Sequence, residues 1–180
     1  MEFKDVITSR TSARSYLDKQ VEDEKILYIL ECARLAPSWV NKQCWRFIVV
    51  KDIETIKELS KTSIINRWLR KVPCIIVACA DPTDSGKNNN IDYFIVDTSI
   101  AMEHLILAAT DIGLGSCWIG GFDEEKVKNI LQIPNRIRVI SLTPIGYPSD
   151  NRRMVDSLSK IITRNTTRKS INEIVHYEKW

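Results

Sequence analysis

The ten residues Ala36-Pro37-Ser38-Trp39-Val40-Asn41-Lys42-Gln43-Cys44-Trp45 join a helix-like run to a strand-like run. Proline ends the helix, because it lacks the N–H that a helix interior requires. Hydroxyl and amide side chains that both donate and accept hydrogen bonds then follow at Ser38, Asn41 and Gln43. Such a set suits the edge of a heterocycle, and connecting loops are where binding residues concentrate. It equally suits an ordinary polar loop that Trp45 pins by packing.

The segments on either side of this stretch predict an α+β protein or a mixed-sheet sandwich. Apolar residues at helical spacing predict helices at 2–9 (with Phe3, Val6 and Ile7 on one face), 22–36, 53–71, 91–113 and 123–131. Short apolar or β-branched runs predict strands at 46–51, 73–79, 116–119 and 138–147. The second of these strands is apolar throughout, which indicates burial on both faces. The helix at 91–113 is apolar enough to be the central core helix, and the asparagine-rich stretch 81–90 is expected to be a surface loop.

Length and composition limit the function classes. A chain of 180 residues, 44% hydrophobic and 27% charged, suits one soluble domain with a real core. The net charge of +3, without aromatics interleaved among the basic residues, argues against nucleic-acid binding. Five cysteines without C-x-x-C spacing form neither a disulfide framework nor a zinc site. The N-terminus is unlike a signal peptide and no apolar run reaches membrane-span length, so we expect a cytoplasmic protein without membrane contact.

The familiar catalytic side-chain arrangements are not found in the sequence. His104 falls in the core helix without a second ligand nearby, which favours a hydrogen-bonded core histidine over a metal ligand. No G-x-S-x-G elbow is present. The stretch Gly113–Trp118 begins like a dinucleotide fingerprint, but it ends in Trp118 and precedes a strand, so it fails that pattern. We therefore predict no catalytic side chain and no metal, which fits an enzyme whose cofactor carries the chemistry.

Two further motifs offer ligand contacts. In Arg10-Thr11-Ser12-Ala13-Arg14, two arginines with a hydroxyl between them can grip a phosphate and a polyol chain. In Gly113-Leu114-Gly115-Ser116-Cys117-Trp118-Ile119-Gly120-Gly121-Phe122, small residues let the backbone approach a flat ring closely. Taken alone, the first motif also fits a solvated turn, and the second also fits a plain strand and turn.

Together these motifs resemble the nitroreductase family, the FMN-dependent NAD(P)H oxidoreductases. Residues 36–45 match the family signature Ala-Pro-Ser-x-x-Asn-x-Gln-Pro-Trp, with Cys44 in place of proline. Residues 10–14 are similar to Arg-Arg/His-Ser-x-Arg, with Thr11 at the basic position, and residues 113–122 are similar to the family's glycine-rich region. Further likenesses are Asp97 at the start of the core helix, the Gly-Tyr-Pro end of the last strand, and the tail at 168–176. Thr166 replaces a lysine often found in that tail.

The resemblance implies a nitroreductase-like fold, with a central, mostly antiparallel sheet flanked by helices. It implies one FMN-binding domain at 1–150 and an extension at 151–180 that wraps the partner of a homodimer. The tryptophans at 39, 45 and 68 would bury area between the two chains. FMN would contact Arg10, Thr11, Ser12, Arg14, Pro37, Ser38, Trp39, Asn41, Gln43, Ile119, Gly120, Gly121 and Arg168. Of these, Pro37, Ser38 and Asn41 would reach the flavin of the other subunit.

The implied activity is a ping-pong reaction in which NADH or NADPH gives a hydride to flavin N5 and a small oxidised acceptor, such as a nitroaromatic or quinone, removes it. Relatives on this fold perform dehalogenation or flavin fragmentation, so the fold does not fix the chemistry. Two other interpretations remain: FMN storage or redox sensing without efficient turnover, and a flavin-free α/β binding module.

Overall fold

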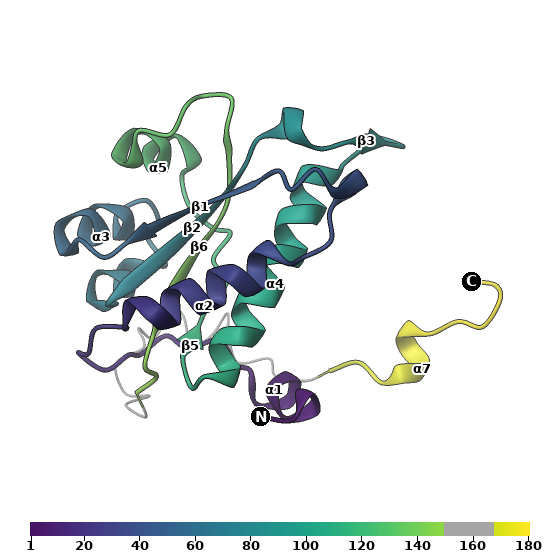
Figure 1. Cartoon of the computed structure of the whole chain (residues 1–180), viewed down its shortest axis with the longest axis horizontal. Helices are drawn as coiled ribbons and strands as arrows, with labels where there is room; N and C mark the ends of the chain where they lie inside the picture. The colour runs from purple at the N-terminus through teal and green to yellow at the C-terminus, as the bar shows by residue number, and fades with distance from the viewer. Residues whose placement is uncertain (150–167) are drawn as a thin grey trace.

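The computed structural model describes residues 1–149 and 168–180. Its centre is a four-stranded antiparallel sheet in the order β1-β2-β6-β5 (Figure 1). The strands are β1 (Trp45–Val50), β2 (Cys74–Ala80), β5 (Gly115–Ser116) and β6 (Arg138–Gly146). The α+β class and the mostly antiparallel sheet expected from the sequence are confirmed.

Helices cover both faces of this sheet. Every residue of β2 is buried, and its side chains alternate between two core clusters, with Ile76 in one and Ile75 and Val77 in the other. The first cluster also contains residues of α2 (Asp23–Arg34) and α4 (Tyr93–Asp111), and the second contains residues of α3 (Ile53–Ser60) and α5 (Glu124–Leu131). The predicted strand with two buried faces is therefore confirmed, because a strand between two helical layers must be apolar on both sides.

The helix α4 is the central helix of the molecule, as predicted. Nine of its residues are buried, which explains a length and apolar composition that would also allow it to cross a membrane. The short helix α1 (Phe3–Ser9) packs beside the far end of α4, where the Met1 amino group contacts Asp111 at 2.6 Å. Val6 is buried as expected, whereas Phe3 and Ile7 on the same helix remain exposed.

The predicted helix at 53–71 is wrong in its second half. The helix α3 ends at Ser60, and a short 3-10 helix, η2 (Arg67–Lys71), follows after a break. The hydroxyls of Ser60 and Thr62 donate to the carbonyls of Lys57 and Leu59. Hydroxyl side chains that bond to nearby carbonyls compete with helix continuation, so this cluster ends α3.

The stretch 81–90 is more ordered than the predicted surface loop. It contains a 3-10 turn, η3 (Pro82–Asp84), and a small hairpin of β3 (Lys87–Asn88) and β4 (Ile91–Asp92). Asn89 and Asn90 form its tip with φ of 48° and 62°, which is the left-handed pair that a two-residue hairpin turn requires. Asp81 and Ser85 are buried, so this stretch contributes to the interior.

The predicted strand at 116–119 is shorter than expected. Pairing with β6 stops after Ser116 and returns as a single bridge between Ile119 and Leu142. In an unchanged register Cys117 would face Pro144, which has no N–H to donate. The interruption therefore has a cause on the neighbouring strand.

The C-terminal prediction is tested only in part. The short helix α7 (Ile171–Ile174) begins with a capping box between Ser170 and Glu173, and residues 168–180 are exposed throughout. The predicted boundary at 150/151 and Thr166 lie outside the described residues.

Candidate functional site

The N-terminal arginine motif and the glycine-rich motif lie side by side. Ser12 forms a parallel bridge with Ser116, and the Ala13 N–H donates to the Ser116 carbonyl at 2.8 Å. The segment 10–14 therefore runs along the outer edge of β5. We call this set of residues, 10–14 with 116–121, the arginine edge.

The guanidinium groups of Arg10 and Arg14 are the charged part of the arginine edge. Both side chains are half-buried, and no ion pair to either is found among residues 1–149 and 168–180, although Arg14 also donates to the Ser12 carbonyl at 3.3 Å. Burial raises the pKa of the nearby Cys117 thiol, while the charge of Arg14, a hydrogen bond with Ser12 and the charge of Arg10 oppose that rise. Both cations therefore act on the same small region, which is suited to an anionic ligand.

Gly120 and Gly121 supply the open part of the arginine edge. Neither has a φ in the left-handed range, and a methyl group added to either would meet no atom within 4 Å. Neither N–H makes a backbone hydrogen bond in the described part of the chain. Packing and conformation therefore do not require glycine here, and among the described residues the two N–H groups have no backbone acceptor, so they are available to a ligand. Ile119 differs, because its side chain is buried and its N–H and C=O both bond to Leu142.

Sequence reasoning missed Asn66 beside this open turn. Its side-chain amide donates to the Gly121 carbonyl at 3.0 Å, and it lies in the break between α3 and η2. Ile64 and Ile65 in the same break are exposed, 83% and 53% respectively. The break was hidden by the helical spacing of the sequence, so nothing indicated that Asn66 reaches the glycine turn.

The polar stretch at 38–43 forms a strained loop, which we call the amide loop. Val40, Asn41 and Gln43 have φ of 48°, 55° and 53°. Such left-handed conformations cost about 1–3 kcal/mol each and cluster at functional sites. The Gln43 N–H donates to Ser38 Oγ at 2.9 Å, and the Gln43 amide donates to the Asn41 carbonyl at 3.1 Å. Three of the predicted ligand residues are thus gathered, and Trp39 lies among them half-buried.

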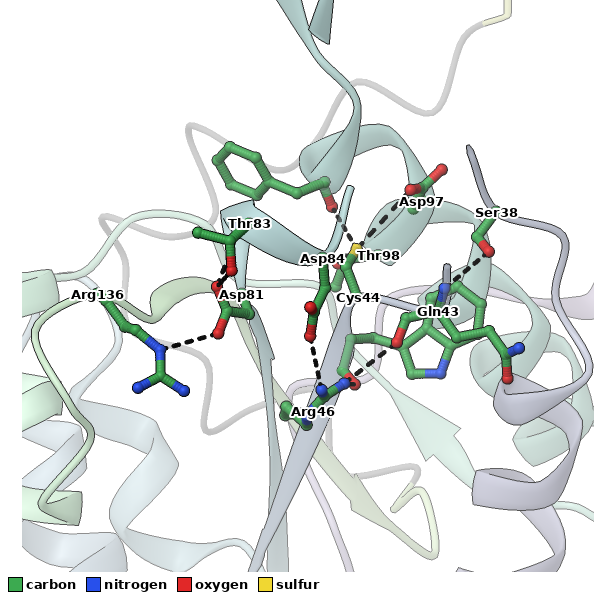
Figure 2. A network of polar contacts seen from close by, with 12 residues as sticks. Ser38, Gln43, Cys44, Arg46, Asp81, Thr83, Asp84, Asp97, Thr98 and Arg136 are labelled. Atoms are coloured by element: carbon green, nitrogen blue, oxygen red, sulfur yellow. Dashed lines mark hydrogen bonds and ion pairs between the residues drawn. The ribbon is translucent and has the colours of Figure 1, made fainter. Parts of the chain in front are cut away.

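Contacts from the stretch 81–86 and from α4 hold the amide loop (Figure 2). Arg46 Nη1 donates to the Gln43 carbonyl at 3.1 Å, and Nη2 contacts Asp84 at 2.8 Å. The backbone N–H of Trp39 donates to Asp97 Oδ1 at 2.9 Å. Sequence reasoning noted Asp97 only as the start of the core helix. An acid among apolar residues in the first half of α4 was the available signal.

The arginine edge and the amide loop of one chain lie far apart. Trp45, just after the loop, pairs with Ala80 at one end of β2, whereas Ser116 pairs with Ile145, which lies beside Cys74 at the other end. That length of strand is about 20 Å, and the three strand spacings from β1 to β5 add about 14 Å sideways. Figure 1 shows the same separation, with the amide loop at the opposite end of α4 from α1.

The remaining predicted residues are placed as follows. Thr11, Pro37 and Arg168 are exposed, and Arg168 precedes α7. Trp45 is buried in the core cluster beside α2 and α4, so its predicted role between two chains is wrong. The His104 Nδ1–H donates to the Cys32 carbonyl at 3.3 Å, so the predicted hydrogen bond is confirmed, but the side chain is half-buried and not in the core. All five cysteines are free thiols.

Two half-buried arginines and a hydrogen-bonded amide loop lie on an α+β sheet that helices cover on both faces, an arrangement suited to binding a small anionic ligand. Comparisons with known proteins narrow the class of protein further. The Nitroreductase family model matches residues 7–66 and 57–147. The chain is 37% identical over 179 residues to a protein of Archaeoglobus fulgidus with the provisional name NADH dehydrogenase/NAD(P)H nitroreductase, covering 97% of each.

Solved structures agree. A nitroreductase family protein from Clostridium novyi NT superposes with a TM-score of 0.81 at 39% identity, over 83% of this chain and 87% of that one. An FMN-dependent nitroreductase from Clostridium difficile R20291 superposes with a TM-score of 0.79 at 29% identity, over 97% and 98%. This chain belongs to the nitroreductase family.

Proposed function

We propose that this chain is an FMN-dependent NAD(P)H oxidoreductase that reduces nitroaromatics, quinones or similar small oxidised acceptors by a ping-pong mechanism. When bound, FMN supplies the chemistry, taking a hydride from NADH or NADPH at N5 and passing it on. The observation that carries this proposal is the arginine edge: two half-buried arginines without a carboxylate partner in the described residues, in the same motif pair as two glycine N–H groups that have no backbone acceptor there. The names of the Archaeoglobus and Clostridium difficile relatives support the donor and the cofactor.

The residues of the arginine edge fit FMN chemically. Arg10, Ser12 and Arg14 would hold its phosphate, its ribityl chain or the N1/O2 edge of its ring, because guanidinium groups match phosphate and carbonyl oxygens in charge and geometry. A cation near that edge also stabilises the negative charge of the reduced ring. Gly120 and Gly121 would leave room for the ring and offer N–H donors to it. No side chain need donate a proton, since water can serve.

The separation of the two clusters supports a homodimer with shared sites. A single FMN cannot contact the arginine edge and the amide loop of one chain, because more than ~20 Å lies between them. The loop residues Pro37, Ser38 and Asn41 would therefore serve the flavin held by a second copy. Apolar side chains remain exposed on the helices that would meet that copy, among them Phe3, Ile7, Leu27, Leu35, Ile95 and Val96. The exposed tail with Arg168 would wrap the partner.

Two further features belong to this proposal. The exposed Ile64 and Ile65 flank the glycine turn, so the break at 62–66 would form a wall of the acceptor site. Five free thiols suit a reducing compartment, which supports a cytoplasmic location.

The test is the visible spectrum of the purified protein with FMN, followed by anaerobic addition of NADH and, separately, of NADPH. A flavin spectrum that bleaches rapidly and recovers with a quinone supports the proposal and identifies the donor. Bound flavin that does not bleach with either donor would replace it with storage or redox sensing. No binding of added FMN would reject it.

A further inference from the structure

One buried carboxylate contacts both ends of the amide loop. Asp97 is 2% exposed and lies in the second turn of α4. Its Oδ1 accepts the backbone N–H of Trp39 at 2.9 Å, and its Oδ2 lies 3.8 Å from the Cys44 sulfur. The Cys44 thiol has the Phe94 carbonyl at the same distance and Thr98 Oγ1 at 3.9 Å, so Asp97 is one of its three weak hydrogen-bond partners. Figure 2 shows the contact between Cys44 and Asp97 as a dashed line. Asp97 therefore contacts the chain both near the start of the amide loop and just after its end.

Asp97 is itself held in place by the stretch 81–86. The Ser85 hydroxyl donates to Oδ2 at 2.7 Å, and Ser85 is also buried. No ion pair to Asp97 is found in the part of the chain that the structure describes. A carboxylate without a cation offers only acceptor sites, so each surrounding donor is turned toward it. Its orientation is therefore determined by Ser85, and the loop is aligned on a fixed pair of oxygens.

The internal hydrogen bonds of the amide loop act against a strained backbone, so contacts with the rest of the fold matter for its shape. Its middle residue, Val40, is 80% exposed and adopts a left-handed conformation that β-branched residues avoid. Two of the other polar side chains that tie the loop to its surroundings are exposed, namely Lys42 on the Ser85 carbonyl and Arg46 on Asp84, and the half-buried Trp39 ring packs on Tyr93 at 4.4 Å between ring centres. Contacts at the surface are weakened by water and salt, whereas a buried charged acceptor is not.

We infer that Asp97 is a positioning residue of the flavin site: through Trp39 and Cys44 it holds Ser38, Asn41 and Gln43 in the arrangement that receives FMN. This inference rests on the proposed FMN oxidoreductase function. It also explains the otherwise unassigned pair Ser85-Gly86. Ser85 orients the carboxylate, and Gly86 leaves room for the Trp39 ring, which a methyl group there would approach to 2.3 Å.

The expected effect follows from the population of the competent loop. If Asp97→Ala leaves the binding arrangement populated for about 1–10% of the time, the apparent Kd for FMN rises about 10- to 100-fold. At saturating FMN, kcat returns to near the wild-type value, because Asp97 touches neither cofactor nor substrate. Asp97→Asn keeps one oxygen for the Trp39 N–H, and the Ser85 hydroxyl can rotate to accept from its amide. We expect this variant to bind FMN within about threefold of wild type.

The first measurement does not require FMN. Amide hydrogen exchange at Trp39 and Gln43, in the full chain without added cofactor, should accelerate about 10- to 100-fold in Asp97→Ala and stay near wild type in Asp97→Asn. The matched control is Asp81→Ala. Asp81 is a second buried acid close by, but its side chain contacts Thr83 and Arg136 instead of the loop. Unchanged exchange in a folded Asp97→Ala protein would overturn the inference.

The second measurement is FMN titration of the same variants, with kcat at saturating FMN. Weakened binding in Asp97→Ala, with wild-type-like binding in Asp97→Asn and Asp81→Ala, supports the inference. Equal loss in Asp81→Ala would reduce Asp97 to a general stability effect and overturn it. If Asp97→Ala does not fold, equal loss of affinity and kcat in Asp97→Asn would overturn it as well. A wild-type chain that binds no FMN would reject the proposed function first, whereas tight binding by both wild type and Asp97→Ala would reject only the role of Asp97.

Discussion

The arginine edge and the amide loop differ in how many of their charges and hydrogen-bonding groups find partners within the same chain. Arg10 and Arg14 are half-buried cations without an ion-pair partner among the described residues, and the N–H groups of Gly120 and Gly121 have no backbone acceptor there. The amide loop is the reverse: its residues bond to one another and to the interior, and the strain lies in its backbone. Unsatisfied groups gain most from a ligand, while a preformed loop gives orientation at little entropic cost.

This contrast predicts that the two regions contribute differently to FMN binding. The arginine edge should supply most of the binding free energy, because charge-assisted contacts to phosphate replace an unfavourable partial desolvation. The amide loop should supply fit to the ring. If the two belong to different subunits in each site, affinity and fit depend on dimer formation in different ways.

The largest effect should come from removing both cations. Arg14→Ala loses a charge-assisted contact of about 1.5–3 kcal/mol, or about 10- to 150-fold in Kd for FMN, and adding Arg10→Ala should abolish measurable binding. Neither change breaks an ion pair found in the described residues, so the free energy of unfolding should stay near wild type. The comparison is Arg138→Ala, which breaks an exposed pair with Glu124 and should bind FMN normally. Unchanged FMN affinity in Arg14→Ala would remove that residue from the site.

Subunit mixing tests whether the two regions serve one site from two chains. A chain with Arg10→Ala and Arg14→Ala, and a chain with Ser38→Ala and Asn41→Ala, should each bind FMN poorly alone. After subunit exchange, a mixed dimer with shared sites contains one site with an intact arginine edge and an intact loop. Flavin content should therefore rise to about one FMN per mixed dimer, since each half of a shared site is independent of the other. No recovery in a verified mixed dimer, or a monomer that retains FMN, would contradict the shared site.

Glycine-to-alanine substitutions should affect the two regions differently: Gly86→Ala should lower stability, and Gly120→Ala should lower FMN affinity. In Gly86→Ala the new Cβ would lie 2.3 Å from the Trp39 ring, so the fold must shift at a cost of about 1–3 kcal/mol. In Gly120→Ala nothing lies within 4 Å, so unfolding free energy should change by no more than about 0.5 kcal/mol while FMN affinity falls several-fold. Urea unfolding and FMN titration measure both quantities. Equal FMN affinity in Gly120→Ala and wild type would show that the ring does not use that space.

The sequence allowed the layers and the arginine edge to be predicted, since those depend on local patterns. The apolar run of β2 indicated a doubly buried strand, and the resemblance to the family pointed to the paired arginines as phosphate ligands, where the residues alone also fitted a solvated turn. The strained part of the amide loop could not be predicted. Val40 and Gln43 in left-handed conformations have no signature in residue type, because contacts with Asp97 and Arg46 from distant elements hold the loop.

The errors in the predicted elements have the same origin. The strand at 116–119 is interrupted because register places Pro144 opposite Cys117, and register is a property of two strands. The helix at 53–71 breaks where hydroxyls bond to the preceding carbonyls, although its apolar spacing continues beyond. Asn66 could be assigned to the glycine turn only after that break was known.

The smallest effect should be a pH dependence at the amide-loop end of the sheet. The Thr83 hydroxyl, followed by Arg136, lowers the pKa of Asp81 from 3.8 to about 2. A folded-state pKa below the unfolded value means that the ionised carboxylate stabilises the fold at pH values above about 4, and that this contribution is lost as the pH falls toward 2. Because Arg136 is 71% exposed, solvent screens the pair and the loss should be small. Urea unfolding of wild type and Asp81→Asn should therefore differ at pH 7 and converge near pH 2, with FMN affinity at neutral pH unchanged. A difference that persists at pH 2, or a neutral-pH loss of FMN affinity, would show that this carboxylate supports the loop in another way.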